Sequence, residues 1–101
     1  MKSLIRYKTK PGRGDQNERL VKNVYAELAQ RDPGGIRYAT WRLEDGVTFI
    51  HIFTTDAEDR SSPLATIKAF NEFQRDLADR CAEQPVSQAV TVVGSYRMLQ
   101  S

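Results

Sequence analysis

The stretch that decides the fold is TFIHIF, residues 48–53, in the middle of the chain. Alternation along a strand places Phe49 and His51 on one face and Ile50 and Ile52 on the other. A half-exposed strand alternates apolar and polar residues, whereas this one is apolar on both faces, so we expect both faces to be covered. The pattern does not decide which of the two coverings lies over the face of His51, the only histidine of the chain.

A strand and a long helix are expected before this stretch. Residues 3–10 have the β-branched and aromatic content of a strand and run into a Pro-Gly turn. Asp15 fits a helix N-cap, and Glu18 three residues later completes a capping-box pair. Apolar residues then recur at the spacing of a helix packed on one side, until the DPGG sequence at 32–35 ends it. These apolar residues are Leu20, Val21, Val24, Tyr25 and Leu28.

Residues 36–43 predict a second strand, which a turn at 44–46 joins to TFIHIF as a hairpin. Further on, Ser62 fits an N-cap with Pro63 at the first helical position. Apolar residues follow at spacings of three and four, as on one helix. They are Ile67, Phe70, Phe73, Leu77 and Cys81. Pro85 prevents continuation of that helix, and the valine-rich residues 87–98 predict the last strand.

The order β-α-β-β-α-β predicts one α+β, ferredoxin-like domain over residues 1–101. Its four-stranded antiparallel sheet carries two helices on one face, which leaves the other face uncovered. That face would expose a large apolar patch, and patches of this kind mark interaction surfaces. We therefore expect a homodimer formed through the sheet face by two-fold symmetry.

Composition excludes several other classes. The net charge of +2 and the interspersed acidic and basic residues argue against a nucleic-acid partner. Without a signal peptide or a membrane-spanning run, we expect no membrane partner and a cytoplasmic location. A single cysteine, a single histidine and no clustered carboxylates argue against a metal site. No P-loop, dinucleotide motif or nucleophile elbow is present, so no cofactor is expected.

Three stretches of the chain resemble the dimeric α/β-barrel superfamily and its antibiotic-biosynthesis-monooxygenase-like group. They are KPG at 10–12, PGGIRY at 33–38, and TFIHIF followed by an acidic turn and a helix with Phe70 and Phe73. The resemblance implies a homodimer with a small pocket in each subunit, between the sheet and its own helices. It also implies either a cofactor-independent oxygenase that acts on small aromatic or phenolic compounds, or a related protein without activity.

The resemblance transfers no catalytic residue. Haem-degrading members use an asparagine on the first strand, a tryptophan before the second helix and a histidine within it. The closest positions here are Ile5, Leu64 and Gln74, so haem degradation is disfavoured. The histidine that many monooxygenase-like members carry at the start of the second helix is absent as well.

Candidate site residues therefore rest on side-chain chemistry. His51 is the natural proton acceptor or donor, because its ordinary pKa lies near neutrality. The alternative is a hydrogen-bonded core histidine. Five aromatic residues are candidates for binding a planar ligand, or for ordinary packing. They are Tyr7, Tyr38, Trp41, Phe70 and Phe73.

An RNA-recognition motif shares the β-α-β-β-α-β order but is disfavoured. Its third strand should expose stacking aromatics, whereas this chain has Val47 and Ile52 at those positions. Two classes of function remain open. One is a cofactor-independent oxygenase, and the other is a non-catalytic dimeric barrel that binds a small apolar or aromatic molecule or serves as a stress-associated module.

Overall fold

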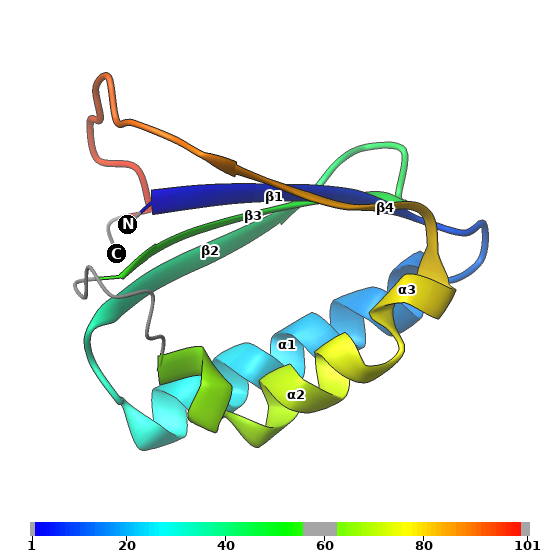
Figure 1. Ribbon diagram of the computed structural model, residues 1–101, viewed down its shortest axis with the longest axis horizontal. Helices are drawn as coiled ribbons and strands as arrows, with labels where there is room; N and C mark the ends of the chain where they lie inside the picture. Colours follow the sequence, from blue (N-terminus) through cyan, green and yellow to red (C-terminus); the bar gives the residue numbers. More distant parts are fainter. Residues whose placement is uncertain (1, 56–62, 100–101) are drawn as a thin grey trace.

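The order of strands and helices is the one that the sequence predicts. The computed structural model describes residues 2–55 and 63–99, and Figure 1 shows how they are arranged. The strands are β1 (Lys2–Thr9), β2 (Ile36–Arg42), β3 (Thr48–Thr55) and β4 (Cys81–Ala89). The helical segments are α1 (Gly14–Arg31), the 3₁₀ turn η1 (Pro63–Thr66), α2 (Lys68–Arg75) and the short α3 (Leu77–Arg80).

The four strands form one antiparallel sheet in the order β2-β3-β1-β4. Helices α1 and α2 pack against each other below one face of this sheet, and no described segment covers the centre of the other face (Figure 1). This arrangement is the predicted ferredoxin-like fold. The two-residue period of β3 therefore decides which of its side chains enter the space between sheet and helices.

His51 lies on the face of β3 that is turned toward the helices. It is 3% exposed, and Phe49 on the same face is 1% exposed. Ile50 and Ile52 point to the other face and remain partly exposed. The buried apolar core between the layers consists of Tyr7, Val21, Val24, Phe49, Leu64, Ile67, Phe73 and Cys81.

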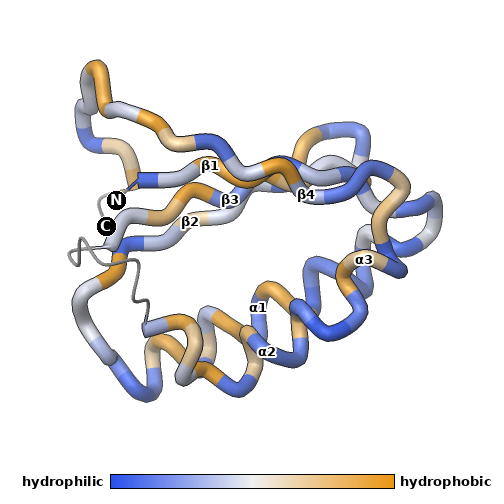
Figure 2. The backbone as a smooth tube through the Cα atoms, in the orientation of Figure 1, coloured by the Kyte–Doolittle hydropathy of each residue, from blue (hydrophilic) through white to orange (hydrophobic). Residues whose placement is uncertain are grey.

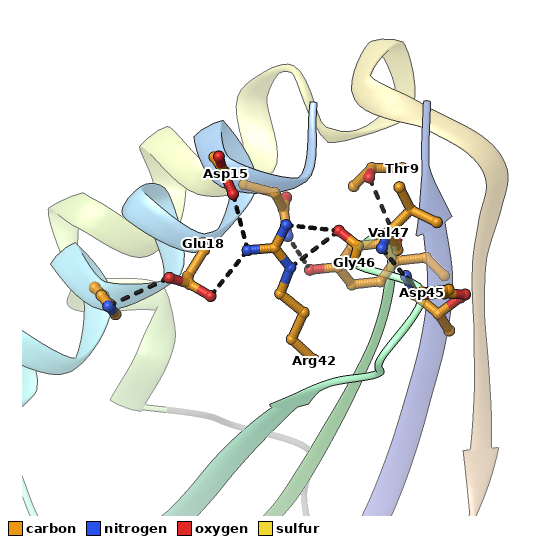
Figure 3. Close-up of polar contacts among 11 residues, drawn as sticks. Thr9, Asp15, Glu18, Arg42, Asp45, Gly46 and Val47 are labelled. Atoms are coloured by element: carbon orange, nitrogen blue, oxygen red, sulfur yellow. Dashed lines mark hydrogen bonds and ion pairs between the residues drawn. The ribbon is translucent and has the colours of Figure 1, made fainter. Parts of the chain in front are cut away.

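Arg42, at the end of β2, connects the β2–β3 turn to the start of α1 through hydrogen bonds and ion pairs (Figure 3). Its Nε and Nη2 donate to the carbonyl oxygen of Gly46 at 2.9 and 2.7 Å. Its Nη1 lies 3.0 Å from the carboxylate of Asp15 and 3.1 Å from that of Glu18. The predicted N-cap role of Asp15 and capping-box role of Glu18 are therefore wrong. Helix α1 begins at Gly14, and both carboxylates bind Arg42 instead.

The predicted second helix is shorter than its apolar spacing suggests. Cys81 begins β4 instead of extending the stripe of a helix, and Pro85 lies within β4. A proline is tolerated there because β4 is an edge strand, and its pairing with β1 is irregular in this region. Pro63 begins the 3₁₀ turn η1 rather than an α-helix, and the predicted N-cap Ser62 lies outside the described residues.

The predicted last strand, residues 87–98, overlaps β4 only as far as Ala89. Ala89 pairs with Ser3, and the N–H of Val90 donates to the carbonyl oxygen of Lys2, the first residue of β1, so the residues after Val90 have no length of β1 left to pair with. They leave the sheet on the side away from the helices (Figure 1) and are apolar along much of their length (Figure 2). The exposed large apolar side chains of this segment are Val92, Val93, Tyr96, Met98 and Leu99.

Candidate functional site

His51 is the centre of a buried polar cluster between the sheet and the helices. Its Nε2 lies 2.7 Å from the hydroxyl oxygen of Tyr7 on β1. Its Nδ1 lies 2.6 Å from the hydroxyl of Tyr38 and 3.1 Å from that of Thr40, both on β2. The ring of Phe73 on α2 packs against the imidazole, with 5.6 Å between ring centroids. Because β3 lies between β1 and β2, each ring nitrogen faces a hydroxyl from a different neighbouring strand.

Two buried residues from the helical layer extend this cluster beyond Tyr7. Nδ2 of Asn17 on α1 donates to the Tyr7 hydroxyl oxygen at 2.8 Å. Nε of Arg80 on α3 donates to Oδ1 of Asn17 at 3.1 Å. Arg80 also donates through Nη2 to the carbonyl of Phe73 at 2.7 Å, and its guanidinium lies 5.4 Å from the centre of that ring. Asn17 is 0% and Arg80 1% exposed, so this end of the cluster is closed to solvent.

The opposite end of the cluster reaches a cavity beside the β2 edge of the sheet. The hydroxyl of Tyr25 on α1 lies 2.7 Å from Oγ1 of Thr40, and both residues line a cavity of about 220 Å³. The other residues that line it are Glu18, Val21, Lys22, Arg42 and Phe49. A path of hydrogen-bonding groups therefore connects His51, through Thr40, to a space that a small molecule can enter.

Burial keeps the cluster electrically neutral apart from Arg80. It lowers the pKa of His51 to about 4, because the imidazolium would lose its hydration inside the core. Burial also raises the pKa of Tyr7 and of Tyr38, so both phenols stay protonated. Among the described residues, no buried side-chain nitrogen or oxygen lacks a hydrogen-bond partner. Each buried polar side-chain atom of the cluster therefore has at least one hydrogen-bond partner.

The structure brings most of the predicted site residues together. Tyr7, Tyr38 and Phe73 surround the histidine, and Phe70 lies beside Phe73 with 6.2 Å between ring centroids. Trp41 does not join them. It is paired with Ile50 in the sheet register and shares its uncovered face, because β2 turns its alternate residues toward the helices.

Sequence reasoning missed Asn17, Tyr25, Thr40 and Arg80 as members of the site. A signal for one of them was present. Asn17 lies four residues before Val21 and so continues the apolar stripe of α1 toward its start. A polar residue at such a position must find a partner inside the core, and this requirement marks it as a candidate site residue.

The described residues contain no cluster of three or more His, Cys, Asp and Glu side chains that could hold a metal ion. Cys81 is buried, and burial raises the pKa of its thiol, which makes it a poor nucleophile. No helix within the described ranges is long and apolar enough to cross a membrane.

Comparison with solved structures finds this fold in antibiotic biosynthesis monooxygenases. One such enzyme is 13% identical, with a TM-score of 0.68 over 92% of this chain and 98% of its own. A variant of SnoaB, a cofactor-independent oxygenase from Streptomyces nogalater, is 17% identical, with a TM-score of 0.66 over 93% of each chain. NE2512 from Nitrosomonas europaea, a protein of unknown function, is 14% identical, with a TM-score of 0.70 over 94% of this chain and 90% of its own.

No protein-family model and no curated protein matches the sequence. The structural likeness nevertheless covers nearly the whole chain, and it confirms the fold that the motifs at 10–12, 33–38 and 48–53 indicate. At these identities the likeness concerns the fold, so the chemistry must be argued from the site itself.

Proposed function

We propose that this protein is a cofactor-independent oxygenase of small aromatic or phenolic compounds. The observation that carries the proposal is the position of His51, which is buried under aromatic rings and linked through Thr40 to a cavity. A buried imidazole that reaches the cavity through a hydroxyl group can stabilise the negative charge that develops on a phenol oxygen, and the apolar side chains beside it help to shield a carbanion-like intermediate from water. The fold shared with a cofactor-independent oxygenase supports the same proposal.

The reaction needs no external reductant. In the simplest case a phenol reacts with dioxygen at a ring carbon, one oxygen atom becomes a quinone carbonyl, and the other leaves as water. The two hydrogen atoms of the water come from the phenol hydroxyl and the ring carbon, and the phenol supplies all four electrons. The protein has only to bind the ring, stabilise the charge that develops on the phenol oxygen and limit the access of water.

The cavity suits a small ligand. Its volume of about 220 Å³ is below the range of pockets for drug-sized molecules and matches a compound of one ring. Phe49 and Val21 supply apolar surface, while Thr40 and Tyr25 supply hydroxyl groups for the polar end of a phenol. We therefore expect single-ring phenols and hydroquinones to bind better than polycyclic ones.

We also propose that two subunits pair through their sheets. The uncovered face carries Ile50, Ile52 and Trp41 from the two neighbouring strands β2 and β3. The segment after Ala89 leaves the sheet on the same side (Figure 1), and it carries further exposed apolar side chains. A second copy related by two-fold symmetry would bury both surfaces at once.

Oxygen uptake with a panel of single-ring phenols and hydroquinones tests the enzymatic proposal. We expect turnover by the wild-type protein, and at least a tenfold loss in His51→Ala and in Tyr38→Phe. Tyr96→Phe is the matched control, because Tyr96 is exposed and lies outside the site, so it should retain full activity. Uptake that is equal in His51→Ala and the wild type would contradict the proposal.

A non-catalytic binding protein is the second candidate. It is favoured by the satisfied state of His51, since both ring nitrogens already have partners within the protein and the imidazole stays neutral. This candidate predicts that single-ring phenols bind, as measured by calorimetry, while no phenol of the panel consumes oxygen.

A further inference from the structure

We propose that a hydrogen-bond chain beginning at Arg80 holds His51 as the neutral Nδ1–H tautomer. In this state Asn17 and Arg80 act as positioning residues, and the histidine offers a hydrogen-bond donor toward the cavity rather than a base. The assignment of the tautomer stands on the geometry of the free protein. The consequence for a bound phenol rests on the proposed function.

The donor-to-acceptor direction of the hydrogen-bond chain is fixed at Arg80, which is its buried end. A guanidinium has only donors, so Nε of Arg80 must donate, and the Asn17 atom 3.1 Å away must be the carbonyl oxygen Oδ1. The amide group of Asn17 is therefore turned toward Tyr7, where Nδ2 donates to the hydroxyl oxygen at 2.8 Å. The orientation of this amide follows from the chemistry of Arg80 and not from a choice between two similar fits.

The Tyr7 hydroxyl group accepts from Asn17 and must therefore donate to His51. Its oxygen accepts from Asn17, and its own hydrogen needs an acceptor, because Tyr7 is 2% exposed. Among the described residues, its other hydrogen-bond partner is Nε2 of His51, at 2.7 Å. If Nε2 carried the hydrogen instead, the Tyr7 hydroxyl hydrogen would be buried without an acceptor, which native structures avoid. Nε2 is thus the acceptor, and the imidazole hydrogen lies on Nδ1.

The Nδ1–H group points to the open end of the chain. It faces the hydroxyl oxygens of Tyr38 at 2.6 Å and Thr40 at 3.1 Å, and Thr40 in turn meets Tyr25 at the cavity. The donors from Arg80 to Nδ1 of His51 therefore point the same way, with a cation at the far end, and the Thr40 hydroxyl, which accepts from Nδ1, is free to donate to Tyr25. Such a chain stabilises negative charge that develops on a phenol oxygen in the cavity, as oriented donors do elsewhere. A neutral imidazole can fill this role as a donor.

The tautomer can be measured directly, because the protein has a single histidine. Uniformly ¹⁵N-labelled, tag-free protein at neutral pH gives one imidazole pattern in a long-range ¹H–¹⁵N correlation spectrum. We expect Nδ1 to show the shift of a protonated nitrogen and Nε2 that of an unprotonated one. The reverse pattern in the wild-type protein would overturn the proposal without any variant.

Asn17→Asp tests whether the chain causes the tautomer. The carboxylate accepts from Arg80 and must also accept from the Tyr7 hydroxyl, so Nε2 of His51 has to donate to Tyr7. We expect the imidazole hydrogen to move to Nε2. Asn23→Asp is the matched control, because Asn23 is exposed on the same helix, and it should keep the wild-type spectrum. A folded Asn17→Asp variant with Nδ1 alone protonated would overturn the proposal.

If Asn17→Asp does not fold, Tyr7→Phe supplies the second test. Without the Tyr7 hydroxyl, Nε2 loses its donor, and the spectrum should change to a mixture of both tautomers. An unchanged pattern of pure Nδ1–H would again overturn the proposal. These spectra are recorded on the free protein, so a failure of the tautomer assignment is distinct from a failure to consume oxygen.

Discussion

The two faces of β3 differ in a way that its composition does not suggest. The face that carries a histidine is buried against the helices, whereas the face that carries only aliphatic side chains at its centre is uncovered. His51 tolerates burial because both of its ring nitrogens are bonded to hydroxyls from the neighbouring strands. Ile50 and Ile52, which gain most from leaving water, are only partly covered within one subunit. Burial of a side chain inside the subunit thus depends on whether hydrogen-bond partners are present as well as on its hydrophobicity.

The largest contrast between the two faces should be in core packing. Phe49 stacks on Tyr7 with 5.6 Å between centroids and is almost fully buried, so Phe49→Ala leaves a cavity. We expect it to lower the free energy of unfolding by about 3–5 kcal/mol. Ile50→Ala, one residue along on the uncovered face, should lower it by about 1 kcal/mol. Urea denaturation of dilute protein measures both values, and equal losses would mean that the two faces are equally packed in the subunit.

The buried histidine should make stability depend on pH. Its pKa is about 4 in the folded protein and about 6.5 in the unfolded chain, so between these values the unfolded state binds more protons. The contribution of the neutral His51 to the free energy of unfolding is fully present above pH 6.5 and is lost as the pH falls toward 4. The full loss is about 3 kcal/mol, from roughly 1.4 kcal/mol per pH unit.

His51→Gln isolates this effect from the carboxylates that titrate in the same range. The carboxylates of Glu18 and Asp45 have lowered pKa values, because hydrogen bonds favour their charged forms. Their protonation at low pH therefore also lowers the free energy of unfolding of the protein. The variant should be less stable than the wild type at pH 7 and should lose less stability on acidification. Parallel curves of unfolding free energy against pH for the two proteins would contradict the burial of a neutral imidazole.

Local patterns predict most of this fold but could not decide which face of β3 is buried. The element order follows from turn signals and periodicity, and those depend on neighbouring residues. The side of His51 could not be predicted, because both parities of the strand are apolar. The bond between Asn17 and Arg80 joins residues 63 positions apart, so no local pattern contains it. Cys81 and Pro85 were misplaced for the same reason, since pairing with β1 overrides the helical spacing there.

The layers that create the buried face are joined at the corner drawn in Figure 3, and a methyl group added there should disturb them. A Cβ on Gly14 would collide with the carbonyl oxygen of Gly46 and lie 2.6 Å from Nη2 of Arg42. We expect Gly14→Ala to lower the free energy of unfolding by about 1–3 kcal/mol. Gly94→Ala is the matched control, because a Cβ there meets nothing within 4 Å. Thermal unfolding of the two variants checks this, and equal midpoints would refute the tight corner.

A charge on the uncovered face should have the smallest effect on the free energy of unfolding of the subunit. It should nevertheless abolish the proposed dimer. In Ile50→Asp the carboxylate is hydrated in a monomer, so circular dichroism should show an unchanged fold, with a loss in unfolding free energy of about 1 kcal/mol or less. In the proposed dimer the same carboxylate would be buried against a second sheet without a partner, which is strongly unfavourable. Light scattering at micromolar concentration should therefore give twice the 11.5 kDa chain mass for the wild type and 11.5 kDa for Ile50→Asp. Phe49→Asp provides the comparison on the other face, where the charge enters the core and should unfold the subunit. A wild-type protein that is monomeric at this concentration would refute the dimer and leave the uncovered face as a surface for another partner. A folded, dimeric Ile50→Asp would instead move the subunit contact away from the centre of the sheet.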